Sequence, residues 1–314
     1  MTKKIATREA YGKVLVDLGK QNEDIVVLDA DLSKSTKTSS FGKEFPNRFF
    51  NMGISEQNLM GTAAGLAASG KIPFASTFAM FATGRAFEII RNSICYPKLN
   101  VKVCATHAGI TVGEDGASHQ ALEDIACMRA IPNMTVINPA DAISAEALIY
   151  AASEYKGPVY IRLGRAKVPV IYNKEDYEFE IGKGIEVKEG QDVTIIATGI
   201  MVDKALKARE DLLKEGISAR VIDIHTIKPI DKDIIIKATK ETKAIVTVEE
   251  HNILGGLGSA VAEVVVENSP VPMKMIGIND TFGESGKPDQ LLEKYGLTPE
   301  NIFNKVKELL NKLK

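Results

Sequence analysis

Short runs of β-branched and apolar residues alternate with helical patterns along the whole chain, and this alternation constrains the fold more than any other feature. Strands that alternate with helices predict mostly parallel sheets covered by helices, the α/β class. In the first half we expect strands at 25–28, 101–104, 135–137 and 159–161, and helices at 8–20, 55–69, 84–95, 119–130 and 141–154. In the second half we expect strands at 193–197, 219–224, 244–248 and 272–278, and helices at 202–215, 231–241 and 256–267.

The alternation breaks between residues 166 and 190, where charged and turn-forming residues predominate and no period persists. We therefore predict two consecutive α/β domains, at 1–168 and 190–314, joined by a linker at 169–189. A chain of 314 residues is about twice the usual domain length, which agrees with this division.

Composition argues against several classes of protein. The formal net charge is −2 with both signs mixed along the chain, so no basic face for nucleic acid is expected. No apolar stretch approaches the roughly 18 residues of a membrane span. The three cysteines lack Cys-x-x-Cys spacing, which favours reduced thiols over disulfides or zinc. Because the N-terminus shows no signal-peptide pattern, we expect a cytoplasmic protein that binds neither nucleic acid nor membrane.

Glu56 follows a turn, Gly53 to Ser55, between an expected strand and an expected helix. An acidic residue in the first turn of a helix complements the helix dipole, so on this interpretation Glu56 needs no chemical role. The alternative is a ligand-binding role, because open parallel sheets bind ligands at such strand-to-helix turns. Both interpretations stay open at this point.

A glycine-rich loop between His107 and His119 is the second candidate site. It places two histidines, the carboxylates of Glu114 and Asp115, and three glycines between a strand and a helix, which favours a polar reactive site. A metal site formed by His107, His119 and Glu123 is an alternative, although this spacing matches no closed zinc signature.

Phe78 and Phe81 lie three residues apart at the end of an apolar strand. Core packing usually explains such a pair. A flat cofactor ring would also need an aromatic face there, and the pair by itself does not decide between these roles.

Taken in order, these segments resemble the transketolase family over nearly the whole chain. The motifs that carry the resemblance are Gly53-Ile54-Ser55-Glu56, Thr77-Phe78 with Phe81, Thr106-His107, Gly113-Glu114-Asp115-Gly116 with His119-Gln120, and Phe282-Gly283-Glu284-Ser285-Gly286. The resemblance implies a pyrimidine-binding domain followed by a transketolase C-terminal domain. Family members hold magnesium and diphosphate through a Gly-Asp-Gly motif in a further, N-terminal domain, and this sequence lacks that motif. We therefore expect the C-terminal subunit of a transketolase made as two polypeptides.

The resemblance also implies which residues bind thiamine diphosphate. Glu56 is expected to hydrogen-bond a nitrogen of the pyrimidine ring, which lets the cofactor deprotonate its own thiazolium carbon. Phe78 and Phe81 are expected to flank the pyrimidine, and Asp31 and Leu32 to lie near the thiazolium.

For the sugar substrates, the resemblance assigns His119 to the reacting oxygen and Asp115 to the sugar hydroxyls. His107 is the third expected catalytic residue, beside Glu56 and His119. The terminal phosphate is expected to bind a cluster formed by Arg8, Ser35, His107 and Arg165. Arginine suits this task because its planar fork pairs with two phosphate oxygens.

The implied reaction transfers a two-carbon ketol unit from a ketose phosphate to an aldose phosphate, in the pentose phosphate pathway. Thiamine diphosphate would be shared with an N-terminal partner subunit that binds Mg²⁺, with no metal ligand in this chain, in an α2β2 assembly. Three alternatives remain: half of a deoxyxylulose-phosphate synthase, the β-type subunit of a 2-oxoacid dehydrogenase, and a non-catalytic module of the same fold.

Overall fold

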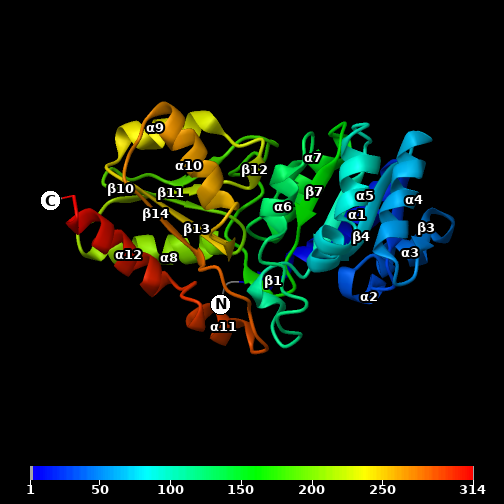
Figure 1. Ribbon diagram of the computed structural model, residues 1–314, viewed down its shortest axis with the longest axis horizontal. Helices are drawn as coiled ribbons and strands as arrows, with labels where there is room; N and C mark the ends of the chain where they lie inside the picture. Colours follow the sequence, from blue (N-terminus) through cyan, green and yellow to red (C-terminus); the bar gives the residue numbers. More distant parts are fainter. Residues whose placement is uncertain (1–2, 314) are drawn as a thin grey trace.

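In the computed structural model, which describes residues 3–313, the larger of two principal sheets has seven strands in the order β12-β6-β7-β5-β4-β2-β3 (Figure 1). The first half of the chain supplies β2 (Ile25–Asp29), β3 (Phe49–Asn51), β4 (Ile72–Phe78), β5 (Lys102–Thr106), β6 (Thr135–Ile137) and β7 (Val159–Arg162). These strands pair in parallel. β12 (Thr226–Lys228) comes from the second half and pairs antiparallel with β6, so the second half completes the sheet of the first.

The smaller sheet has five strands in the order β14-β13-β10-β11-β9. Its strands are β9 (Ile185–Lys188), β10 (Val193–Ala197), β11 (Ala219–Asp223), β13 (Ile245–Asn252) and β14 (Met273–Ile278). All pairs are parallel except β9 with β11. The helices that cover this sheet are α8 (Met201–Lys214), α9 (Lys232–Glu241), α10 (Leu257–Asn268) and α12 (Pro299–Asn311) (Figure 1). The predicted α/β class, with mostly parallel sheets covered by helices, is confirmed.

Helices also cover both faces of the larger sheet. They are α1 (Thr7–Gln21), α2 (Ser33–Thr36), α3 (Ser39–Glu44), α4 (Glu56–Ala68), α5 (Phe87–Ile89), α6 (Asp124–Ala130) and α7 (Ala142–Glu154). On one face α1 packs against α3 and α7 over a buried apolar cluster that includes Tyr11 and Leu148. On the other face α4 and α6 cover a cluster that continues into the second unit through Ile222 and Ile245. The two units therefore share this apolar cluster.

Several short elements connect these layers. The segments η1 (Pro46–Arg48) and η4 (Ile110–Val112) are 3₁₀ turns, and η2 (Phe81–Arg85) and η3 (Ile90–Cys95) are π-helical turns. α11 (Pro288–Lys294) follows the smaller sheet, and β1 (Lys4–Ile5) pairs with β8 (Val168–Pro169). β8 and β9 both overlap the stretch at 169–189 that the sequence suggested as a linker. The division at 1–168, 169–189 and 190–314 stays a prediction.

Two expected helices differ from the structure. The helix expected at 84–95 is interrupted by the π-helical turns η2 and η3, which surround the single turn of α5. The helix expected at 119–130 begins only at Asp124. Its first residues are held in a loop instead, because Ala121 bridges to Ala108 and its carbonyl accepts a hydrogen bond from the Gly109 N–H at 3.0 Å.

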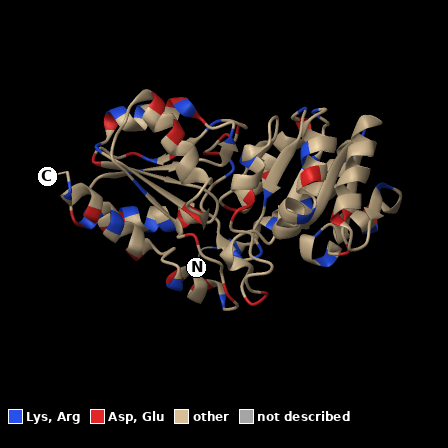
Figure 2. Cartoon of the chain, in the orientation of Figure 1, with Lys and Arg blue, Asp and Glu red and all other residues tan. Residues whose placement is uncertain are grey.

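Charged side chains of both signs are interspersed over the outer helices of both units (Figure 2), as the net charge of −2 leads one to expect. Within residues 3–313, no helix has the length and apolar character that crossing a bilayer requires. Cys95, Cys104 and Cys127 are all free thiols, in agreement with the prediction from their spacing.

Candidate active site

The carboxyl ends of β2, β4 and β5 lie side by side at one edge of the larger sheet, because these neighbouring strands are parallel. Asp31 follows β2, Phe78 ends β4 and His107 follows β5. Open α/β sheets bind ligands at this edge. The order of the strands therefore brings together residues that are far apart in the sequence.

Glu56 is the first residue of α4, and its side chain is only 5% exposed. Its Oε1 lies 3.2 Å from Nη1 of Arg85, whose guanidinium lies 4.1 Å from the centre of the Phe81 ring. Gly53, in the turn before α4, has a φ of +70°, a conformation that glycine adopts without strain. Glu56 thus complements the helix dipole and also presents a buried carboxyl group beside an aromatic ring.

Aromatic rings form a continuous group that Arg85 links to this carboxyl. The Phe78 ring lies 5.8 Å from Phe81 and 3.8 Å from the imidazole of His107, nearly parallel to both. His119 meets Phe81 edge-on, with the ring centres 5.3 Å apart. Phe78 and Phe81 thus border the site as well as packing against each other.

His107 is held as a neutral imidazole. Its Nε2 lies 3.3 Å from Nη1 of Arg8, and its Nδ1 lies 2.9 Å from Oγ1 of Thr106. Arginine can only donate, so Nε2 accepts and the proton resides on Nδ1, which donates to Thr106. Burial, followed by the positive charges of Arg8 and Arg165, lowers the pKa of His107 to about 3. His107 therefore carries no charge at neutral pH.

Arg8 and Arg165 form a positively charged corner beside His107. Nη1 of Arg8 donates to the Ser35 carbonyl at 2.7 Å, while its Nε is buried without a protein partner. Burial and then the charge of Arg165 lower the pKa of Arg8. Arg165 donates to the Val112 carbonyl and to Glu114 Oε2, the latter at 3.0 Å. Two neighbouring cations with an unused donor favour an anionic ligand.

Asp31 and Leu32 occupy a turn that is held by hydrogen bonds to Asp29. Asp29 was not among the residues predicted from the sequence. Asp31 has a φ of +62°, and its Oδ1 accepts from Asn51 Nδ2 at 3.0 Å. Asp29 is fully buried and accepts from the Leu32 N–H at 2.6 Å and from the hydroxyl of Thr36 at 2.6 Å. Burial raises the pKa of Asp29. An acidic residue directly after the apolar run 25–28 was the available signal.

Asp115 and His119 lie on a loop that forms hydrogen bonds with residues of the second unit. Asp115 is exposed, whereas His119 is half-buried with Nδ1 3.0 Å from the Ser118 hydroxyl. The neighbouring Gln120 donates to the carbonyl of Glu284 at 2.9 Å, and the Ser285 hydroxyl donates to the Glu114 carbonyl at 2.6 Å. The Phe282–Gly286 motif thus contacts the histidine loop, residues 107–119, a role that the sequence alone does not reveal.

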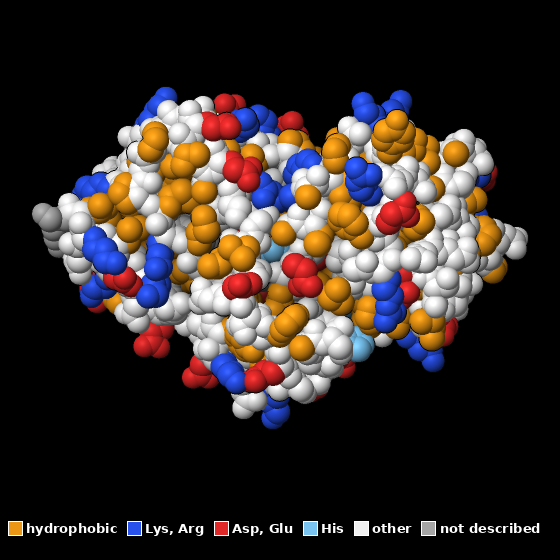
Figure 3. All heavy atoms as spheres, viewed as in Figure 1, with side chains coloured by type: hydrophobic (Ala, Val, Ile, Leu, Met, Phe, Trp, Pro, Cys, Tyr) orange, Lys and Arg blue, Asp and Glu red, His pale blue; other side chains and the backbone are white. Residues whose placement is uncertain are grey.

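A pocket of about 630 Å³ lies between the two units, next to these residues. The first unit contributes Phe81, Arg85 and Ser118, and the second contributes Asn252 and Phe282. Figure 3 shows apolar side chains on both sides of the junction between the units, among groups of both charges. The pocket is therefore bordered by the same π-helical turn, η2, that carries Phe81.

His119 and Glu123 do not share a helix, since α6 begins after Glu123. The Glu123 carboxylate accepts from the N–H of Leu122 at 2.9 Å. Among residues 3–313, no group of three or more His, Cys, Asp or Glu side chains is placed to hold a metal ion. The structure thus gives no support to the metal alternative.

Comparison with known proteins gives matches over nearly the whole chain. Residues 3–170 match the family model "Transketolase, pyrimidine binding domain", and residues 182–302 match "Transketolase, C-terminal domain". A chain from Methanocaldococcus jannaschii, named as a transketolase C-terminal section, is 58% identical over 97% of this chain and 96% of its own length. A 6-deoxy-6-sulfo-D-fructose transketolase subunit from Clostridium sp. (strain MSTE9) is 42% identical over 96% of this chain and 94% of that subunit.

A solved structure described as a split gene transketolase, an inactive β4 tetramer, has the same fold. It superimposes with a TM-score of 0.92 at 62% sequence identity, and the match covers 98% of this chain and 99% of that one.

Proposed function

Since the chain belongs to the transketolase family, as a C-terminal subunit with the pyrimidine-binding and C-terminal domains, we propose that it serves a thiamine-diphosphate-dependent transketolase. The proposed reaction transfers a two-carbon ketol unit from a ketose phosphate to an aldose phosphate. The observation that carries this proposal is the buried Glu56 carboxyl, linked through Arg85 to the Phe78 and Phe81 rings at the carboxyl edge of the sheet.

These residues fit the pyrimidine half of thiamine diphosphate. A buried carboxyl can hydrogen-bond a ring nitrogen, and the faces of Phe78 and Phe81 can pack against a flat ring. Asp31 and Leu32, in the turn after β2, would lie beside the thiazolium. When bound, the cofactor supplies a nucleophilic carbon for cleaving a carbon–carbon bond of the ketose. Arg85 bonds Oε1 of Glu56, and the second carboxyl oxygen would serve the ring nitrogen.

The substrate would be held by its terminal anion at one end and its reacting oxygen at the other. Arg8, Arg165, Ser35 and His107 surround the proposed phosphate position, where an anion would offset the repulsion between the two guanidinium groups. Because His107 is neutral, it would orient the substrate by hydrogen bonding without adding charge. His119 would hydrogen-bond the reacting oxygen, and the exposed Asp115 would bind sugar hydroxyls.

The diphosphate and Mg²⁺ would be bound by an N-terminal partner subunit, because this chain lacks the Gly-Asp-Gly motif of the family. Two observations support this partner. The related C-terminal section and sulfofructose transketolase subunit match this chain over nearly their whole lengths. The split-gene β4 tetramer is described as inactive. We propose that this chain assembles with its partner as α2β2 in the cytoplasm.

Reconstitution tests the proposed function. The chain is co-expressed with a candidate partner that contains Gly-Asp-Gly, and ketol transfer between sugar phosphates is assayed with and without thiamine diphosphate and Mg²⁺. Activity should require both subunits and both cofactors. Transfer from pyruvate to glyceraldehyde phosphate would instead identify a deoxyxylulose-phosphate synthase, oxidation of a 2-oxoacid would identify a dehydrogenase, and inactivity on all substrates would favour a non-catalytic module.

A further inference from the structure

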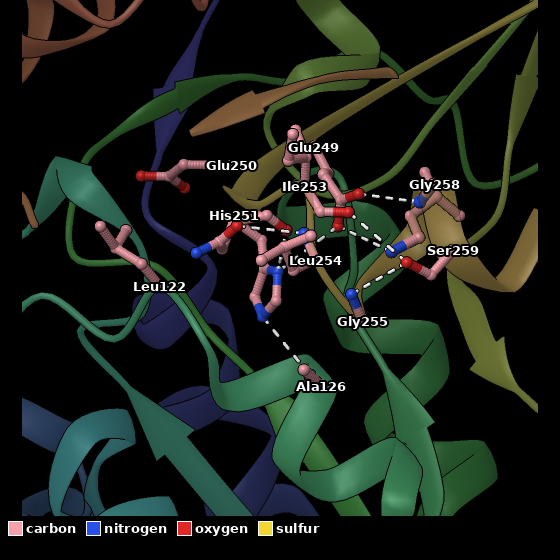
Figure 4. A network of polar contacts seen from close by, with 12 residues as sticks. Leu122, Ala126, Glu249, Glu250, His251, Ile253, Leu254, Gly255, Gly258 and Ser259 are labelled. Carbon is pink, nitrogen blue, oxygen red and sulfur yellow. Dashed lines mark hydrogen bonds and ion pairs between the residues drawn. The ribbon is translucent and has the colours of Figure 1, made fainter. Parts of the chain in front are cut away.

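Three titratable residues, Glu249, Glu250 and His251, follow one another at the end of β13, and all are buried (Figure 4). Their exposed fractions are 0%, 4% and 0%. Burying charged groups is costly unless hydrogen bonds or opposite charges compensate them. The partners of these residues therefore indicate what each one does.

Glu249 and His251 bond to helix ends and to the backbone. The Glu249 carboxylate accepts from the N–H groups of Leu257 and Gly258 at 2.7 and 2.8 Å, at the start of α10 in its own unit. The His251 ring lies 2.6 Å from the Asn252 carbonyl through Nδ1 and 3.4 Å from the Ala126 N–H through Nε2 (Figure 4). Glu249 thus stabilises a helix start within the second unit.

Glu250 points the other way, as alternation along a strand requires, and reaches the first unit. Its Oε1 accepts from the N–H of Thr111 at 2.7 Å, in the η4 turn of the histidine loop. A Cβ atom on Gly109, which has a φ of +82°, would overlap the Glu250 carboxyl group. The carboxylate is therefore in contact with the backbone that directly follows His107.

A buried arginine keeps Glu250 in this position. Nη2 of Arg162 donates to the Glu250 carbonyl at 3.0 Å, and Nε of Arg162 pairs with Asp124 at 2.7 Å. The backbone beside the carboxylate also joins the two ends of the histidine loop, since the Gly109 N–H donates to the Ala121 carbonyl. The carboxylate of Glu250, in the second unit, thus contacts the loop backbone that lies between His107 and His119.

We propose that Glu250 is a positioning residue, which fixes the histidine loop (residues 107–119) so that His107, Asp115 and His119 meet the sugar substrate. For its effect on catalysis this inference rests on the proposed function. Glu56, Phe78 and Phe81 come from other elements, so loss of the Glu250 contact should disturb sugar turnover and leave cofactor binding intact.

The test compares Glu250→Ala with Glu250→Gln, which keeps an acceptor oxygen, and with Glu249→Ala as the matched control. Hydrogen exchange of the backbone amides is measured by mass spectrometry on the full chain. Glu250→Ala should speed exchange in the histidine loop by about tenfold or more, since the Thr111 N–H loses its partner. Glu250→Gln should restore slow exchange. Glu249→Ala should speed exchange at the start of α10 instead.

The same variants are then assayed in the reconstituted complex. Glu250→Ala should lower kcat/KM for sugar phosphates about tenfold or more with an unchanged thiamine diphosphate Kd, because a small displacement of catalytic groups is enough to slow a reaction. If Glu250→Ala left hydrogen exchange in the loop unchanged, the positioning role would be refuted. It would also be refuted if the variant showed faster exchange but kept the kcat/KM of the wild type. Absence of ketol transfer in the wild-type complex would refute the proposed function alone, because the exchange measurement requires no activity.

Discussion

The two parallel sheets carry titratable residues at the same place, the carboxyl ends of their strands, and use them in opposite ways. At the larger sheet Asp31 and Asp115 are exposed and His119 is half-buried, and a pocket lies beside Ser118, the neighbour of His119 in the chain. At the smaller sheet Asp223 and Glu249 are fully buried, and their partners are other parts of the chain. At the larger sheet, buried groups such as Glu56 and His107 thus share the strand ends with accessible ones, and this combination indicates a ligand site. In the second unit, Asp223 and Glu249 stabilise the fold through hydrogen bonds within the chain.

The largest effect should come from Glu56, whose buried carboxyl lies in the candidate site at the larger sheet. In the reconstituted complex, Glu56→Gln should slow hydrogen–deuterium exchange at the thiazolium carbon of bound thiamine diphosphate by orders of magnitude, because glutamine cannot share a proton with the ring nitrogen. Nuclear magnetic resonance after acid quench measures this rate. If Glu56 served only the helix dipole, the variant would lose at most about 1 kcal/mol of stability and keep its exchange rate.

Arg165→Ala should have the next largest effect. Loss of one of two guanidinium groups around the proposed phosphate position should raise KM for phosphorylated sugars by about a hundredfold, and KM for unphosphorylated analogues much less. Steady-state kinetics on both substrate classes measures the difference. Arg209→Ala is the control, since Arg209 bonds to the Ala219 carbonyl within the second unit. Equal losses on both substrate classes would contradict the phosphate-binding role.

The buried Asp223, at the end of β11, tests whether a buried carboxyl of the smaller sheet contributes to stability. Burial raises its pKa to about 8, and its Oδ2 accepts from the Tyr172 hydroxyl at 2.7 Å. The folded state thus binds this proton more tightly than the unfolded state, whose aspartates titrate near 4. The stabilisation is complete below about pH 4 and is lost as pH rises towards 8.

Asp223→Asn removes this titration. Relative to the variant, the wild type should therefore lose roughly 2.5 kcal/mol of unfolding free energy between pH 5 and pH 7. Urea denaturation at the two pH values measures it. Asp192→Asn is a control that should leave the difference between pH 5 and pH 7 unchanged, because hydrogen bonds from the Ser218 N–H and Lys243 lower the pKa of Asp192, which is then ionised in both the folded and the unfolded protein over this range. Parallel pH profiles for wild type and Asp223→Asn would show that Asp223 is ionised in the fold.

The smallest effect concerns His107, where we expect a change in rate without a change in pH dependence. Because the pKa of His107 is lowered to about 3, it is uncharged throughout the range in which the enzyme would be assayed. His107→Asn should reduce kcat/KM for sugar phosphates yet leave the shape of its pH profile between pH 5 and 9 unchanged. Disappearance of an ionisation near pH 6 to 7 in the variant would show that His107 titrates in the active complex.

Local pattern was sufficient to predict many of the regular elements. Strands such as β10 and helices such as α7 were expected within a residue or two of their observed bounds, because their apolar periodicity is uninterrupted. α12 was missed although its N-terminus has a sequence signal, Thr298 followed by Pro299. β12 has only three residues and forms by pairing with a distant strand, so no local pattern announces it.

For the site, the sequence indicated which residues to inspect but not what holds them. It pointed to Phe78, Phe81, His107 and His119, and the structure brings all four into ring contact. Glu250 was overlooked because β13 was expected to end at Val248, where its apolar run ends, whereas the strand continues to Asn252. Buried charges at a strand end break the apolar pattern by which strands are recognised, so contacts across the units could not be inferred from periodicity.

The strand β12, supplied by one unit to the sheet of the other, limits how this protein can be taken apart. A protein engineer who transplanted the first unit as a cofactor-binding module would leave β6 as a bare sheet edge, with backbone donors and acceptors free to capture strands of other molecules. Such a fragment should aggregate through this edge, and also through the apolar cluster that continues into the second unit. The smallest transferable piece of this architecture therefore includes β12 together with the chain that leads to it.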